Sequence, residues 1–139
     1  GTQGQILTKK QTEFTSVTTD SRGDVKGKVF LALKGDVHDG HNYIKACIEK
    51  GVAAIISSEM NDEFKRLSSE VTWIQVDDTL KALQSLGQYW REKLKLTVIG
   101  VTGSNGKTSV KDFAFTLLST VYPVQKSMGS FNNHWGVPL

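Results

Sequence analysis

Residues 100–109 read Gly-Val-Thr-Gly-Ser-Asn-Gly-Lys-Thr-Ser, and their types and order are suited to binding a nucleotide. Glycines let several main-chain N–H groups converge on a phosphate, because no Cβ stands in the way. Lys107 would reach the β- and γ-phosphates and the Thr108 hydroxyl would bind Mg²⁺, so these two are the predicted catalytic residues. The predicted ATP-binding set is Gly103, Ser104, Asn105, Gly106, Lys107, Thr108 and Ser109.

The segments on either side of this loop have the patterns of a strand and a helix. The apolar run at residues 96–100 predicts a strand that enters the loop. After the loop, apolar residues recur at helical spacing, namely Val110, Phe113, Ala114, Leu117 and Leu118. The positive end of this helix would point at the phosphates. A strand, a glycine-rich turn and an amphipathic helix are the context that a phosphate-binding loop requires.

The glycine spacing departs from the usual loop, which would have a glycine where this chain has Val101. An ordinary strand-to-helix turn with a solvated Lys107 therefore stays open as an alternative. A dinucleotide-binding fingerprint fits less well. The Gly-x-Gly-x-x-Gly order is missing, and Gln125 and Lys126 stand where an acidic residue would bind the ribose.

Composition limits the classes of protein to which the chain can belong. The 139 residues are 38% hydrophobic and 22% charged, which is typical of a soluble globular protein of one ordinary domain or two small ones. A formal net charge of +3 does not indicate nucleic acid as a partner. No apolar run approaches the roughly 20 residues of a membrane span. The single Cys47 predicts core packing without a disulfide, and a cytoplasmic location is expected.

The elements that must position these residues alternate between strand and helix patterns in the first half of the chain. Strands are predicted at residues 14–19, 28–33, 53–57 and 72–76. Helices are predicted at 41–50, ending at Gly51, and at 61–69. A longer helix is predicted after the N-cap Asp78, with Leu80, Leu83, Gly87, Trp90 and Leu94 on one stripe. The first half is therefore predicted to be a small mixed α/β domain.

The second half has the pattern of the beginning of a parallel-sheet ATPase domain, with a second short strand predicted at residues 121–125. We place the first domain at residues 1–80, and a linker helix with the start of the ATP-binding domain at 81–139. A phosphate-loop fold needs several parallel strands. An acidic residue from a later strand end would complete the Mg²⁺ site, but the last acidic residue of this sequence is Asp112, inside the loop's helix. We therefore expect the N-terminal portion of a larger ATP-using enzyme.

Five short segments carry residues that occur together in one enzyme family. They are residues 19–22 (Thr-Asp-Ser-Arg), 27–35 (Gly-Lys-Val-Phe-Leu-Ala-Leu-Lys-Gly), 39–41 (Asp-Gly-His), 103–108 (Gly-Ser-Asn-Gly-Lys-Thr) and 131–139 (Phe-Asn-Asn-His-Trp-Gly-Val-Pro-Leu). With them the chain resembles the Mur ligases, which build the peptide stem of bacterial peptidoglycan. The resemblance also explains the glycine spacing, because Thr-Gly-Ser/Thr-Asn-Gly-Lys-Thr is this family's form of the loop. Ser130 departs from the family, which often has asparagine there.

The resemblance implies an activity. The ending of the chain is most similar to the branch that adds D-alanyl-D-alanine to UDP-N-acetylmuramoyl-tripeptide, with ATP and Mg²⁺, through an acyl phosphate. The branch that adds the third residue usually has a Thr-Thr-Pro-type stretch there. The full-length protein is expected to be a monomer. This portion is expected to be inactive alone, and its uncovered apolar sheet edge would be open to disorder or to self-association.

The resemblance also assigns substrate-contacting residues. The segments that match Ser21, Arg22 and the loop at residues 35–38 contact uracil and pyrophosphate in the family. We place contacts with the muramoyl substrate or with a phosphate after the strand predicted at residues 121–125. The predicted UDP-substrate-binding set is Ser21, Arg22, Gly35, Asp36, Val37, His38, Asn132, Asn133 and His134. Without the resemblance, residues 20–23 also fit a plain polar turn.

Three functions remain to be distinguished. The chain could be part of the ATP-dependent ligase, a non-catalytic module that binds a UDP-sugar peptide, or an unrelated phosphate-loop NTPase or kinase. The motifs at residues 19–22 and 131–139 favour the first two over the third, because a generic kinase does not need them. His38 and His41 form a poor metal site, since no cysteine or third ligand is near in the sequence, and His41 is suited to start a helix.

Overall fold

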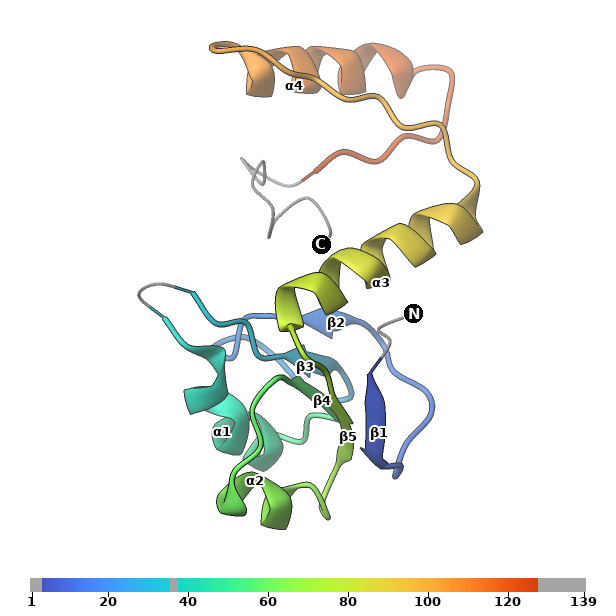
Figure 1. The fold of residues 1–139 in the computed structure, drawn as a ribbon. Coiled ribbons are helices and arrows are strands. Elements are labelled where there is room, and N and C mark those ends of the chain that lie inside the picture. Colours follow the sequence, from blue (N-terminus) through green and yellow to red (C-terminus); the bar gives the residue numbers. More distant parts are fainter. Residues whose placement is uncertain (1–3, 36–37, 128–139) are drawn as a thin grey trace.

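The computed structural model describes residues 4–35 and 38–127 of the chain. Its centre is one five-stranded sheet, in the order β1-β5-β4-β3-β2 (Figure 1). Strands β2 to β5 run parallel to their neighbours, and β1 runs antiparallel to β5. The strands are β1 (Gln5–Thr8), β2 (Val17–Thr18), β3 (Val29–Leu31), β4 (Ala54–Ser57) and β5 (Thr72–Gln75).

Helices cover both faces of this sheet, because the central strands are apolar on both sides. On β3, Phe30 lies in the core on one face of the sheet, and Val29 and Leu31 lie in the core on the other face. On β4, Ile55 and Ile56 separate in the same way. This is the period-two alternation of a strand that is buried twice.

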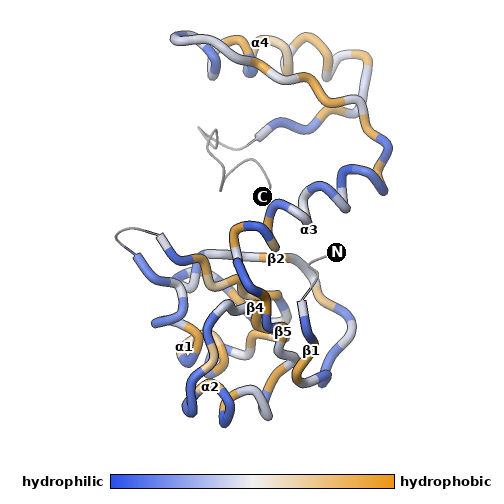
Figure 2. The backbone as a smooth tube through the Cα atoms, viewed as in Figure 1, coloured by the Kyte–Doolittle hydropathy of each residue, from blue (hydrophilic) through white to orange (hydrophobic). Residues whose placement is uncertain are grey.

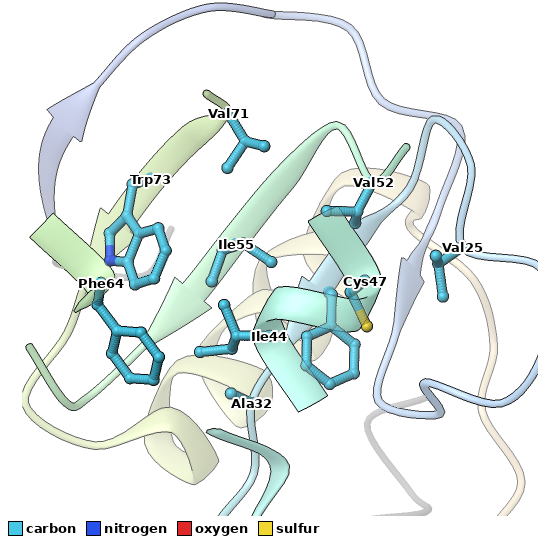
Figure 3. Packing of buried hydrophobic residues seen from close by; sticks show 10 residues of the cluster. Val25, Ala32, Ile44, Cys47, Val52, Ile55, Phe64, Val71 and Trp73 are labelled. Carbon is cyan, nitrogen blue, oxygen red and sulfur yellow. The ribbon is translucent and has the colours of Figure 1, made fainter. Parts of the chain in front are cut away.

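The first of the two cores lies under α1 (Ile44–Glu49) and α2 (Asp62–Leu67). In it the rings of Phe64 and Trp73 meet with their centroids 5.6 Å apart (Figure 3). The second core lies under the first turns of α3 (Thr79–Leu94), which contributes Ala82 and Leu83. Figure 2 shows the hydrophobic residues gathered along the strands between these layers.

Side-chain caps set where α2 and α3 begin, and the cap at Asp78 is the one that the sequence predicts. Asn61 accepts a hydrogen bond from the Phe64 N–H and starts α2, and Asp78 accepts from the Leu80 and Lys81 N–H groups and starts α3. The helix predicted from residue 41 begins as the 3₁₀ turn η1 (Gly40–Tyr43), capped by Asp39, and continues as α1. Gly51 follows it with φ +83°, the conformation that a terminating glycine supplies. The predicted mixed α/β class and its four strands are confirmed.

Strand β1 is the element that the sequence analysis missed. It has four residues, and its Ile6 and Leu7 are both exposed, so no alternation marks it. Only its pairing with β5, at the edge of the sheet, makes it a strand. A Cβ on the preceding Gly4 would lie 2.7 Å from the Gln75 carbonyl oxygen, which shows how closely this segment approaches β5.

The strands predicted at residues 96–100 and 121–125 are wrong, because both segments are irregular here. A strand needs a hydrogen-bonded neighbour, and no described segment pairs with either of them. Residues 123–127 instead lie along α4 (Lys107–Leu118), where the Lys126 ammonium pairs with Asp112 at 2.7 Å. Many apolar residues of this part are exposed, and Trp90 and Leu94 at the end of the α3 stripe are exposed as well. They include Leu96, Val98, Ile99, Val110, Phe113, Leu117, Val121 and Tyr122.

Of the helices in the described ranges, none is both long and apolar enough to cross a membrane.

Truncating Ile55 tests the central position of β4. Ile55→Ala should lower the free energy of unfolding by roughly 2–5 kcal/mol, because the side chain is fully buried between strands and helices. Ile6→Ala, on the exposed part of β1, is the matched control and should cost much less. Urea unfolding followed by tryptophan fluorescence measures both variants, and equal losses would contradict the two-sided core.

Burial should also make Cys47 unreactive. Desolvation raises the pKa of its thiol to about 11, so little thiolate is present at pH 8 in the folded chain. A chromogenic disulfide reagent should react slowly with native protein and rapidly in denaturant. A native thiol that reacts as fast as the denatured one would place Cys47 at the surface.

Candidate functional site

The phosphate-loop candidate lies at the start of α4, and two glycines give it its shape. Gly103 has φ +148° and Gly106 has φ +76°, both in the region that favours glycine. A Cβ on Gly106 would meet nothing within 4 Å, so glycine is needed there for the backbone conformation and not for space. The predicted helix is confirmed, and it begins at Lys107.

The first turn of α4 has N–H groups that the helix cannot satisfy. Gly106 is the N-cap and supplies no side chain, and the first helical hydrogen bond runs from the Val110 N–H to the Gly106 carbonyl. The N–H groups before Val110 therefore have no intrahelical acceptor. Together with the positive end of the helix dipole, they form a site suited to a phosphate oxygen.

Lys107 is folded back over the loop. Its ammonium donates to the main-chain carbonyl of Gly103 and, at 3.5 Å, to that of Ser104. These are weak partners compared with a phosphate, because a charge-assisted bond between two ions is stronger than one to a neutral carbonyl. The side chain is therefore held beside the loop and can exchange a carbonyl for a phosphate oxygen.

The fit to Mg²⁺ is only partial within the described residues. Thr108 supplies a hydroxyl, but Mg²⁺ in nucleotide sites is usually also held by a carboxylate. The nearest carboxylate along the chain, Asp112, accepts a hydrogen bond from Lys126, and this bond lowers its pKa. Thr108 is thus one candidate ligand of an incomplete set.

The turn after β2 holds an arginine ready for an anion. Asp20 accepts hydrogen bonds from the Arg22 backbone N–H at 2.9 Å and from its guanidinium at 2.9 and 3.0 Å. The side-chain bond from Arg22 is the main reason why the pKa of Asp20 falls to about 2. The Arg22 side chain is 87% exposed, so its remaining donors face solvent.

Lys50 fixes the same turn from the end of α1. Its ammonium donates to the Ser21 carbonyl at 2.7 Å, across 29 residues of sequence. The sequence analysis missed this residue, because no local pattern links the end of one helix to the turn after another strand. Lys50 adds a second positive charge beside Ser21 and Arg22.

The loop after β3 is closed at its base. The Gly35 N–H donates to the His38 carbonyl at 2.8 Å, and Lys34 and Asp39 form an antiparallel bridge. His38 is exposed. The predicted contacts Asp36 and Val37 lie outside the described residues.

The structure brings the two segments with predicted UDP contacts to the same end of the sheet, since β2 and β3 are parallel and each loop follows a carboxyl end. Open α/β sheets bind ligands at this edge. The phosphate loop lies beyond α3, in another part of the chain (Figure 1). Predicted contacts Asn132, Asn133 and His134 are outside the described ranges.

His41 is buried, unlike a solvated loop histidine, and it lies in η1 as the helix-start alternative predicted. Its Nδ1 is 2.6 Å from an Asp39 carboxylate oxygen, and its Nε2 is 3.3 Å from the Ser58 N. Possible metal-ligand atoms of Asp39, His41 and Glu59 lie within 4.8 Å of one another. The Lys34 ammonium already pairs with both carboxylates, so this cluster carries its own cation.

Comparison with known proteins gives one family. A profile described as "Mur ligase family, catalytic domain" matches residues 13–91. The UDP-N-acetylmuramoyl-tripeptide–D-alanyl-D-alanine ligase of Bacillus subtilis is 42% identical over 94% of this chain. The chain spans 28% of the length of that relative.

Crystal structures of two MurF proteins contain a region that is similar to this chain. A crystal structure of MurF from Acinetobacter baumannii superposes on 99% of this chain with a TM-score of 0.88 and 38% identity, and the match covers 30% of that protein. The MurF ligase of Thermotoga maritima, solved in complex with ADP, matches 88% of this chain with a TM-score of 0.70 and 32% identity, over 27% of its own length.

Removing the arginine tests the turn after β2. In Arg22→Ala the pKa of Asp20 should rise from about 2 toward the usual 3.8, because the guanidinium that stabilises the carboxylate is gone. The wild-type turn is therefore stabilised above pH 3.8 and loses that stabilisation as the pH falls through 2. Carbon-detected NMR titration of Asp20 measures this. A pKa that stays near 2 would show that Arg22 does not hold the carboxylate, and Arg66→Ala is the control.

Proposed function

The chain belongs to the Mur ligase family, and we propose that it forms the uridine-binding domain and the phosphate-binding loop of a ligase that joins D-alanyl-D-alanine to UDP-N-acetylmuramoyl-tripeptide. The observation that carries the proposal is the presence, in one chain, of an exposed arginine at a parallel sheet's carboxyl edge and a glycine-shaped loop at a helix start. Relatives named for this reaction match nearly the whole chain.

Each half of the chain has its own role in this proposal. Residues 1–80 bind the UDP part of the substrate, with Ser21, Arg22 and residues 35–38 as contacts. Residues 81–139 are a linker helix and the start of the ATP-binding domain, with residues 103–109 around the phosphates. Residues 132–134 contact the muramoyl substrate or a phosphate. A diphosphate suits Arg22, because a guanidinium can donate two parallel hydrogen bonds to it.

The reaction needs an activated carboxylate. A carboxylate oxygen of the tripeptide attacks the γ-phosphorus of ATP, ADP leaves, and an acyl phosphate forms. The amine of the dipeptide then attacks the carbonyl carbon, the C–O bond to phosphate breaks, and an amide and inorganic phosphate result. Lys107 would leave its carbonyl partners and neutralise charge on the transferred group. Mg²⁺, held in part by Thr108, would supply further charge neutralisation when bound.

The cellular setting follows from the substrates. We propose a cytoplasmic, monomeric full-length protein that uses ATP, Mg²⁺ and nucleotide-linked precursors, with no nucleic acid and no membrane as partner. The exposed apolar residues of α4 and of the segment before the loop suit a covering domain of the complete ligase, and leave this chain free to self-associate. A non-catalytic binding module remains the second candidate, because Asp112, the carboxylate nearest to Thr108 along the chain, is paired with Lys126.

Two single substitutions should separate the two ligand sites. Arg22→Ala should weaken binding of UDP-N-acetylmuramoyl-tripeptide roughly tenfold to a hundredfold, because one charge-assisted contact is lost, and leave Mg-ATP binding unchanged. Lys107→Ala should have the opposite pattern. Calorimetric titration of each variant with each ligand, and with UDP alone, measures this.

The same titrations decide between the candidate functions. Binding of Mg-ATP without any response to the uridine ligands would favour an unrelated phosphate-loop protein. Uridine binding with no turnover, when the chain is joined to the remaining part of a full-length relative, would favour the non-catalytic module. UDP-N-acetylmuramoyl-dipeptide is the control ligand for the branch, and it should bind through the same UDP contacts.

A further inference from the structure

The Asp-Gly-His motif at residues 39–41 has no part in the proposed ligand contacts, yet it lies at the centre of a closed polar network. Lys34 pairs with Asp39 at 3.6 Å and with Glu59 at 2.7 Å. Asp39 accepts from His41 at 2.6 Å, and His41 contacts Ser58, the residue before Glu59. We call these five residues the polar network. It joins the segment after β3 to the segment after β4.

The network fixes the ionisation and tautomer of its members. The Ser58 backbone N–H can only donate, so His41 Nε2 is the acceptor and the proton is on Nδ1, facing Asp39. Burial by itself would raise the pKa of Asp39, but hydrogen bonds from the backbone and the ring of His41 outweigh it, and the pKa lies below its usual value. Hydrogen bonding and charge from Glu59 raise the pKa of Lys34. Asp39 and Lys34 are thus both ionised at neutral pH.

Backbone geometry attaches the network to the loop. The Gly40 N–H donates to the Leu33 carbonyl at 2.7 Å, and a Cβ on Gly40 would lie 2.8 Å from that oxygen and 3.0 Å from the Ala32 Cα. Only glycine allows so close an approach. The Ser57 hydroxyl donates to the Glu59 carbonyl and accepts from the Glu59 N–H, which fixes the other side.

We propose that the polar network is a positioning device that holds Gly35 and His38 in the conformation that binds the uridine diphosphate group. The proposal rests on the proposed function, because those two residues are themselves among the predicted UDP contacts. Lys34, His41 and Glu59 act as positioning residues through the loop and do not touch the ligand. Backbone groups that are already held in place bind a ligand more tightly, since less ordering accompanies binding.

The variant Glu59→Gln distinguishes positioning from direct contact. Glu59 follows β4 and is 25 residues from Lys34. If Lys34 bound the diphosphate itself, removing Glu59 would free its ammonium and leave UDP binding unchanged or tighter. Under the proposal, Glu59→Gln loosens the hold on Gly35 and His38, and its Kd for UDP-N-acetylmuramoyl-tripeptide rises about five- to tenfold. Lys34→Met should raise the Kd by the same factor. The double variant should be within about twofold of either single one, because both break one network.

Conservative variants and controls complete the series. Lys34→Arg keeps the charge and should keep wild-type affinity. Lys65→Met removes an exposed lysine that pairs with Asp62 outside the network, and it should change nothing. Mg-ATP affinity should be the same in all variants. Additive losses in the double variant, or tighter binding in Glu59→Gln, would overturn the proposal.

Hydrogen exchange supplies a readout that does not depend on a ligand. The amides of Gly35 and Gly40 should exchange about tenfold faster in Lys34→Met and Glu59→Gln than in the wild type, and long-range nitrogen NMR should find the His41 proton on Nδ1. If the wild type fails to bind any uridine ligand, the proposed function fails in this chain, while the exchange rates still test the network. Unchanged exchange of Gly35 in both variants would overturn positioning.

Discussion

Burial of β3 and β4 on both faces is the constraint on which the rest of this structure depends. Phe30 and Ile55 pack under α1 and α2, while Leu31 and Ile56 pack under α3, so neither strand can slide by one residue without placing a different set of side chains in each core. The register of these strands fixes where they end. Their carboxyl ends in turn set the starting points of the loops that carry the candidate uridine contacts.

Polar groups at that edge then fix the positions of the loops more precisely than packing in the two cores can. Asp20 holds Arg22, Lys50 holds the Ser21 carbonyl, and the polar network ties the segment after β3 to that after β4. Each such contact contributes little to stability, because most of these side chains are partly exposed. Their effect is on geometry, since a site for a diphosphate depends on where a few donors point.

The candidate phosphate loop takes its shape from a different source. Its shape comes from the positive φ of Gly103 and Gly106 and from the start of α4, which are local properties, and α4 buries no residue in this chain. The loop can therefore take a suitable shape while the apolar faces beside it stay exposed. The edge that carries the candidate uridine contacts, by contrast, exists only because the five strands form one sheet.

The sequence by itself determined the features that depend on neighbours within a few residues: four of the strands, the cap at Asp78, the glycine after α1, the loop before α4 and the family that the motifs indicate. Only the tertiary structure decided the rest. Strand β1 exists through its pairing with β5, and residues 96–100 form no strand because no described segment pairs with them. Lys50, Lys34 and Glu59 join the site from distant positions. Periodicity reports which side of an element is apolar, but hydrogen bonds between strands and ion pairs between loops depend on the three-dimensional partner.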